Sequence, residues 1–173
     1  MKSLRDLRSQ ESGARISPHT APKRIHGLFQ QKREQDSRFG KDGFYQPAEL
    51  ARSPFLGALF EGFIAAETIK AQSNRGQRPE LYYFRDEQGL EVDFLLPRRG
   101  GSVALVECRA TRTVTPAMAG PMQRLAEALR KKRPREFRVE MSLVHQSPKT
   151  PIASQTVAAG VRAWAWADFV RRL

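Results

Sequence analysis

The sequence predicts an α/β domain in which helices flank a mixed central sheet. Apolar residues recur at helical spacing after residue 54, and three short runs rich in β-branched and aromatic residues follow within residues 80–109. A second helical pattern then leads into a further strand-like run. The order helix, three strands, helix, strand and a strand–helix tail is typical of a sheet that combines antiparallel and parallel pairs.

The first helix is predicted to begin at Ser53-Pro54, because serine is a good N-cap and proline suits the first helical position. It should end between Asn74 and Gly76, where glycine and polar residues interrupt the pattern. The apolar positions that define its buried face are Phe55, Leu56, Leu59, Phe60, Phe63, Ile64 and Ile69.

Three strands are predicted over residues 80–85, 90–96 and 103–109. The turn between the first two is Asp86-Glu87-Gln88-Gly89, and the next turn contains Arg98-Arg99-Gly100-Gly101. Glycine in both turns permits the positive φ angles that tight connections need. These three strands should therefore form an antiparallel meander.

The second half continues the alternation. Pro116 opens a second helix that closes in a basic run, and residues 137–145 alternate as a strand. Residues 148–159 are polar and are predicted to form a loop. Residues 161–166 are predicted to form the last strand, and Asp168 to cap a terminal helix.

The first fifty residues differ in composition from the rest. Residues 1–50 are rich in Arg, Lys, Gln and Ser and have little periodicity, so we expect a basic, irregular or disordered segment. Residues 51–173 are long enough for one domain with a hydrophobic core.

Charge and cysteine content limit the classes of function. The formal net charge is +12, which favours a polyanion partner, first nucleic acid and second an anionic membrane surface. The single cysteine, Cys108, excludes an internal disulfide and fits a reducing cytoplasm. No apolar run is long enough to span a bilayer and no secretory signal follows Met1, so we expect no membrane segment. The three histidines are scattered and suggest no ligand cluster.

Two of the predicted strands carry an acid near their middle. Asp93 lies within Leu90–Leu96 and Glu107 within Val103–Arg109, both otherwise mainly apolar. An unpaired buried carboxylate is costly, and a divalent metal is a favourable partner for two facing acids. Asp93 and Glu107 are therefore predicted to form a metal site.

The turn decides whether the two acids meet. If the loop comprises Arg99, Gly100 and Gly101, Asp93 lies opposite Glu107 on the same face of the sheet. A two-residue loop shifts the parity and puts the acids on opposite faces. The sequence leaves both registers open.

The same residues resemble a known family. Residues 57–67, the run Leu81-Tyr82-Tyr83-Phe84-Arg85-Asp86, the run Gly89-Leu90-Glu91-Val92-Asp93-Phe94 and the run Val106-Glu107-Cys108-Arg109 carry the resemblance. They are similar to the uncharacterised C-terminal domain of many prokaryotic AAA+ ATPases, with a PD-(D/E)XK restriction-endonuclease-like fold. The resemblance covers about residues 54–172.

The resemblance implies roles for four residues. Glu61, Asp93 and Glu107 match its acidic positions, and Asp93 and Glu107 would hold Mg²⁺ that polarises a phosphodiester. Arg109 stands where the family has lysine, so it would stabilise phosphate charge and would not act as a base. Gln123 would line the same cleft.

The resemblance and the charge together lead to three hypotheses. The first is magnesium-dependent hydrolysis of DNA, the second an inactive nucleic-acid-binding module, and the third an interaction domain that docks on an AAA+ ATPase. ATP hydrolysis by this chain is not expected, because no G-x-x-x-x-G-K-[ST] loop is present. We therefore expect either a stand-alone domain or the remnant of a longer ATPase. The residues predicted to contact nucleic acid are Arg98, Arg99, Arg130, Lys131, Lys132 and Arg133.

Overall fold

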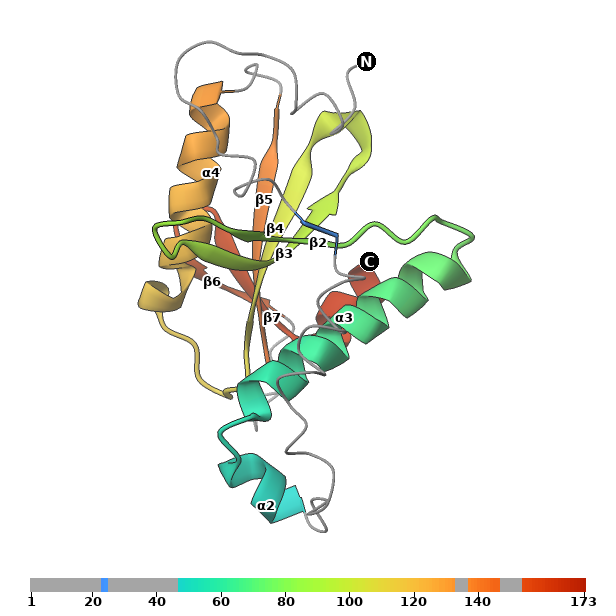
Figure 1. The fold of residues 1–173 in the computed structure, drawn as a ribbon, viewed down its shortest axis with the longest axis vertical. Helices are drawn as coiled ribbons and strands as arrows, with labels where there is room; N and C mark the ends of the chain where they lie inside the picture. Colours follow the sequence, from blue (N-terminus) through green and yellow to red (C-terminus); the bar gives the residue numbers. More distant parts are fainter. Residues whose placement is uncertain (1–22, 25–46, 133–136, 147–153) are drawn as a thin grey trace.

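The computed structural model describes residues 23–24, 47–132, 137–146 and 154–173, and in these residues seven strands form one mixed sheet with helices on both faces (Figure 1). The predicted α/β class with a mixed sheet is confirmed. The strand order is β1-β2-β3-β4-β5-β7-β6. The strands are β1 (Lys23–Arg24), β2 (Tyr82–Arg85), β3 (Glu91–Pro97), β4 (Val103–Arg109), β5 (Val139–His145), β6 (Ser154–Ala158) and β7 (Val161–Ala165).

The sheet has an antiparallel half and a parallel centre. β2, β3 and β4 pair antiparallel in succession, as the predicted meander requires, and β1 adds to β2 in the same sense. β4, β5 and β7 pair in parallel, and β6 closes the edge antiparallel to β7. A parallel pair needs a crossover, which a helix supplies between β4 and β5. The helical segments are α2 (Pro47–Arg52), α3 (Leu56–Asn74), η5 (Arg99–Gly101), η6 (Pro116–Ala119), α4 (Gly120–Lys132) and α5 (Trp166–Arg172).

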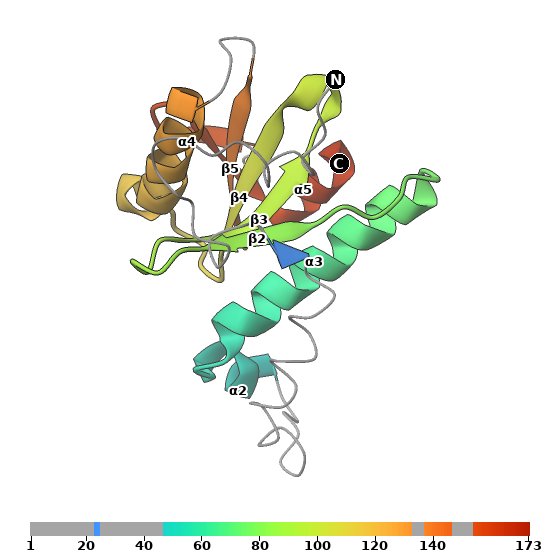
Figure 2. The same ribbon diagram turned by 45° about the horizontal axis from the view of Figure 1, so that its top comes forward.

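Helices cover both faces of the sheet, so the core has two layers (Figure 2). α3 and α5 pack on one face, where Phe60, Ile64 and Phe169 contact alternate residues of the central strands. α4 packs on the other face through Met122 and Leu125. Because both faces are covered, β4 is buried along nearly its whole length, as expected for a central strand.

The end of α3 is joined to the chain before β2 by a buried amide. Gln72 accepts a hydrogen bond from the Glu80 backbone N–H (2.9 Å) and donates one to the Glu80 carbonyl (3.3 Å). Both polar groups of this amide are therefore satisfied at the boundary between helix and strand. The pairing fixes where α3 ends relative to the sheet.

The predicted start of the first helix is two residues early. α3 begins at Leu56, and Ser53 precedes it in a turn in which its Oγ accepts a hydrogen bond from the Phe55 N–H (3.1 Å). Serine thus satisfies a backbone donor near the helix start, but one turn outside the helix. Asp168 likewise lies in the first turn of α5, whose N-cap is Ala165.

The predicted polar loop over residues 148–159 is wrong at its end. Residues 154–158 form the edge strand β6, which pairs with β7 across a turn at Gly160. The polar residues of β6 hid the strand, because an edge strand needs little apolar surface. The last strand also ends at Ala165, so Trp166 begins α5.

The N-terminal segment is only partly described. β1 pairs with β2, and α2 begins at Pro47, so these two pieces are regular within the predicted irregular region. Residues 1–22 and 25–46 lie outside the described residues, and the expectation for them stays a prediction. Among the residues that the structure describes, none of the helices combines the length and apolarity needed to traverse a bilayer.

We predict that Gly160→Ala destabilises the fold. Gly160 has φ +72°, and a Cβ there would lie 3.2 Å from Cε of Met141, so the variant should lose about 1–2 kcal/mol of unfolding free energy. Urea unfolding measures the loss. Gly57→Ala is the matched control, because its Cβ meets nothing within 4 Å and alanine favours a helix. Equal stability of the two variants would contradict the prediction.

Candidate functional site

The β3–β4 hairpin has the three-residue loop, one of the two registers that the sequence left open. The Arg98 N–H donates to the Ser102 carbonyl (2.9 Å), which leaves residues 99–101 as the loop. Gly100 and Gly101 have φ angles of 73° and 76°, which glycine adopts at little cost. The pairing runs from Pro97 opposite Val103 to Phe94 opposite Val106. Extended by one residue, the same register puts Asp93 opposite Glu107.

A β-bulge at Asp93 interrupts the regular alternation of side chains along β3. Tyr82 pairs with Leu95 but Phe84 pairs with Val92, so two residues of β3, Asp93 and Phe94, face one residue of β2. Val92 and Leu95 consequently both pack in the α4-side core, although strict alternation would put them on opposite faces. Alternation alone, on which the sequence argument relied, therefore does not place the Asp93 side chain.

The Asp93 carboxylate bridges β3 and β4 where their pairing stops. Its Oδ2 accepts a hydrogen bond from the Cys108 backbone N–H at 2.7 Å. The pairing between the two strands ends at Phe94 and Val106, so this side chain takes over beyond the last paired residues. Asp93 is thereby held next to the acidic end of β4.

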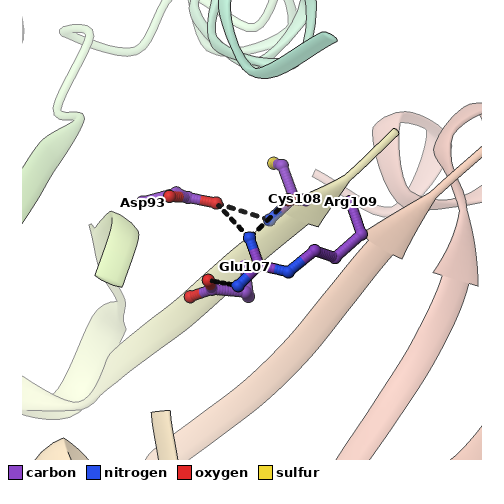
Figure 3. A network of polar contacts seen from close by, with 4 residues as sticks. All are labelled: Asp93, Glu107, Cys108 and Arg109. Carbon is purple, nitrogen blue, oxygen red and sulfur yellow. Dashed lines mark hydrogen bonds and ion pairs between the residues drawn. The ribbon is translucent and has the colours of Figure 1, made fainter. Parts of the chain in front are cut away.

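Arg109 is the cation between the two acids (Figure 3). Its Nη2 donates to Oε1 of Glu107, and its Nη1 donates to the Cys108 carbonyl at 3.0 Å. The same Nη1 lies 4.0 Å from Oδ2 of Asp93. The Arg109 side chain is 36% exposed, whereas those of Asp93 and Glu107 are 12% and 4% exposed. The guanidinium thus lies where solvent reaches the site.

The electrostatics of Glu107 are dominated by burial. Burial, followed by the charge of Asp93, raises the pKa of Glu107 to about 8, although Arg109 opposes the shift. Its Oε2 is buried, and within the described residues it has no hydrogen-bond partner. A buried polar atom without a partner is uncommon in a folded protein. The unpaired Oε2 marks Glu107 as a candidate metal ligand.

Asp93 is shifted in the same direction. Burial and then the charge of Glu61 raise the pKa of Asp93 to about 6, while the Cys108 N–H and Arg109 lower it. Two carboxyl groups with raised pKa values that share one guanidinium are typical of a functional site. Their negative charge exceeds the local positive charge when both are ionised.

The structure places Glu61 on α3, half-buried and close enough for its charge to act on Asp93. It does not assemble the three acids into a ligand set, since no group of three or more His, Cys, Asp or Glu side chains able to hold a metal occurs among the described residues. Gln123, expected in the cleft, instead donates to the Ala159 carbonyl (3.3 Å) at the β6–β7 turn.

One residue near the site was missed by the sequence analysis. His145 lies directly beside Arg109 in the parallel β4–β5 pairing and is buried. Its Nδ1 lies 2.6 Å from the Gln146 carbonyl, which makes Nδ1 the donor. Only the parallel register reveals this neighbour, because 36 positions separate the two residues along the chain.

The β3–β4 hairpin loop and the end of α4, which carry the predicted nucleic-acid-binding residues that the structure describes, lie at the other end of the sheet (Figure 1). The hairpin loop and the end of α4 lie there together, since β5 follows α4 and the Val103 N–H donates to the Arg138 carbonyl at 3.0 Å. Arg133 lies outside the described residues. The other predicted residues at this basic end are Arg98, Arg99, Arg130, Lys131 and Lys132, of which Lys131 pairs with Glu127.

Comparison with known proteins assigns a family without a function. The sequence profile of the family described as Domain of unknown function (DUF4143) matches residues 56–157, from the start of α3 into β6. This agrees with the expected uncharacterised domain. Searches of curated proteins and of solved structures gave no significant match.

We predict that the Glu107 carboxyl group makes the free energy of unfolding fall as pH rises. Its raised pKa means that ionisation is disfavoured in the folded state, so the wild type should lose unfolding free energy between about pH 4.5 and 8. Relative to wild type, the free energy of unfolding of Glu107→Gln should rise by on the order of 2–4 kcal/mol between these two pH values. Above about pH 8 the difference between the two proteins should stay constant. Urea unfolding in a chelating buffer measures the difference at each pH.

The control variant, Glu127→Gln, should show the opposite change in stability. Lys131 lowers the pKa of the exposed Glu127, so Glu127 stabilises the fold above its usual pKa and loses this effect as pH falls. Glu127→Gln should therefore lose a little stability at neutral pH and none in acid. If Glu107→Gln followed the wild type at every pH, burial would not dominate the Glu107 carboxyl.

Proposed function

We propose that this chain, which belongs to the family described as Domain of unknown function (DUF4143), is a nuclease-like domain that hydrolyses phosphodiester bonds in DNA with the help of Mg²⁺. Asp93 and Glu107 hold the metal, and Arg109 stabilises the phosphate charge. The proposal includes the restriction-endonuclease-like type of the fold, which the resemblance of the sequence suggested.

The observation that carries the proposal is the unpartnered Oε2 of Glu107. It is buried next to a second carboxyl group, and among the residues that the structure describes Glu107 is bound by Arg109, which contacts the other oxygen. A hydrogen-bonded structural glutamate would satisfy both oxygens, because leaving one unpaired costs about 1–3 kcal/mol or more for a charged group. A cation ligand explains why this atom is left available.

The two acids fit a magnesium ion chemically. Mg²⁺ prefers oxygen ligands and is usually bound through one or two carboxylates, with water and substrate phosphates in its other positions. The absence of a third acid from the described set is therefore compatible with Mg²⁺. When bound, the ion would polarise the phosphodiester and lower the pKa of its water.

Arg109 supports the substrate in this proposal. A guanidinium is always protonated, so Arg109 cannot act as the general base. It is partly exposed and has five N–H donors, of which the hydrogen bonds to Glu107 and to the Cys108 carbonyl occupy two. The remaining donors are suited to phosphate oxygens, whose charge increases during hydrolysis.

The basic end supplies affinity in this proposal. Exposed arginine and lysine side chains at the hairpin and at the end of α4 attract the DNA backbone without reading its sequence. The net charge of +12 acts in the same direction. Binding should therefore weaken as salt concentration rises.

A specific observation favours a second candidate, a module that binds nucleic acid without cleaving it. The Arg109 guanidinium already contacts Glu107 and lies 4.0 Å from Asp93, so a protein cation occupies the position next to both acids. If Arg109 compensates the acids permanently, no metal is needed. Docking on an AAA+ ATPase stays a prediction from the resemblance alone.

We predict that calorimetric titration detects one magnesium or manganese site that needs both acids. The wild type should bind either ion, and Asp93→Asn/Glu107→Gln should lose binding because both carboxylate ligands are removed. Glu87→Gln, in the exposed turn before β3, is the control and should bind normally. No binding by folded, metal-free wild type, with or without DNA, would exclude the metal site.

Cleavage separates the two candidate functions. A supercoiled plasmid incubated with wild type and Mg²⁺ should be nicked, and Arg109→Lys should nick it faster, because lysine can orient or activate water while keeping its charge. Asp93→Asn should be inactive. If the wild type binds the plasmid but neither it nor Arg109→Lys cuts it, the non-cleaving module is the correct function.

A further inference from the structure

Two arginines share one tryptophan on the other side of the sheet from α4. Trp164 lies on β7 and is buried in the core beneath α3 and α5. The guanidinium carbon of Arg172, on α5, lies 4.2 Å from the centre of the indole ring. The guanidinium carbon of Arg162, on β7, lies 5.5 Å from the same centre. The indole therefore supports two cations.

The charge of this pair is not compensated within the described part of the chain. No carboxylate there forms an ion pair with Arg162 or Arg172, and both side chains are exposed. The neighbouring Arg171 differs, because its Nη1 contacts Oδ1 of Asp168 at 2.7 Å. Arg162 and Arg172 therefore retain their full attraction for an external anion.

Both guanidinium groups lie over one indole ring. Their carbons are 4.2 and 5.5 Å from the same ring centre, so the two charges are at most the sum of these distances apart and attract the same stretch of a polyanion. Two like charges held this close repel each other, and an anion relieves the repulsion. Guanidinium groups bind phosphate oxygens in pairs and in plane, and stacking on an indole fixes their orientation.

A hydroxyl group lies beside the same pair. Thr156 on β6 is directly opposite Arg162 in the antiparallel pairing, so both side chains project from the same face of the sheet. Thr156 is exposed and its hydroxyl makes no hydrogen bond to another described residue. It adds a neutral donor to the two cations, which is the mixture found at phosphate contacts.

We propose that Arg162 and Arg172, supported by Trp164 and with Thr156 beside them, bind the phosphate backbone of a nucleic acid. This phosphate site is distinct from the Asp93–Glu107 site and from the basic end, since Trp164 lies two strands from Cys108 and near the β6 edge. It rests on the proposed function only in the choice of a nucleic acid as ligand.

The test compares two adjacent arginines that differ in their partners. Binding of a fluorescein-labelled single-stranded DNA oligonucleotide is measured by anisotropy at several salt concentrations, in EDTA so that no metal contributes. Arg172→Gln should weaken binding by about 3–10-fold and reduce the salt slope by about one unit. Arg171→Gln removes the same charge from the same helix but should have a clearly smaller effect. Arg162→Gln should behave like Arg172→Gln.

A second measurement separates this site from the proposed function. Inorganic phosphate is titrated into ¹⁵N-labelled wild type at constant ionic strength, and the indole N–H signals of Trp164 and Trp166 are followed. The Trp164 signal should shift with saturation, the Trp166 signal should not, and Arg172→Gln should abolish the shift. Thermal unfolding confirms that each variant is folded.

Each outcome decides the proposal. Equal effects of Arg171→Gln and Arg172→Gln on DNA binding, with no Trp164 shift, overturn the phosphate site and leave the metal-dependent function standing. A Trp164 shift with equal effects on DNA overturns the nucleic-acid ligand in favour of a small phosphate compound. If the wild type binds no DNA at all, the proposed function fails, while a saturable Trp164 shift still supports a phosphate site.

Discussion

Two buried carboxyl groups that share a single guanidinium are the constraint on which the site depends. Asp93 and Glu107 come from adjacent strands, and Arg109 contacts one and lies near the other. With both acids ionised the site has one negative charge too many. Burial raises both pKa values, and the charge of a neighbouring carboxylate raises each of them further. A proton, a metal ion or a further cation must compensate this charge. The chemistry of the site follows from which of them is bound.

The fold keeps these charges in place despite their cost. β4 is paired on both sides and buried by helices on both faces, so Glu107 cannot turn to solvent without loss of core packing. Asp93 is fixed differently, by a bulge and by the Cys108 N–H at 2.7 Å. A bulge disturbs the pairing of a strand and re-aims its side chains, often next to a functional site. The rigid acid and the re-aimed acid together define the position that a ligand would occupy.

Features that depend on residues close together in the chain could be predicted from the sequence. Features that depend on how the strands pair could not. The acids on β3 and β4 were found because a carboxylate within an apolar run is conspicuous, and the glycines of the hairpin pointed to a loop with positive φ angles. The bulge at Asp93 has no signal of its own, because Tyr83 and Phe94 fit a regular strand equally well. His145 was missed because only the parallel β4–β5 register brings it to Arg109. β6 was missed because its polar residues resemble a loop.

The exposed cations that would attract a polyanion and the buried acids that would bind a metal lie in different parts of the sheet. The basic residues of the hairpin and of α4 lie at one end of the sheet, the buried acids lie where the β3–β4 pairing stops, and the stacked pair Arg162 and Arg172 lies beyond β5. A polyanion attracted to exposed cations would be repelled by two ionised acids, unless a cation covers them. Arg109 supplies one charge and cannot lose it. In the proposed function, the remaining charge at Glu107 would therefore decide whether the domain only holds a nucleic acid or also acts on it, because only a bound metal ion both removes the repulsion and activates water.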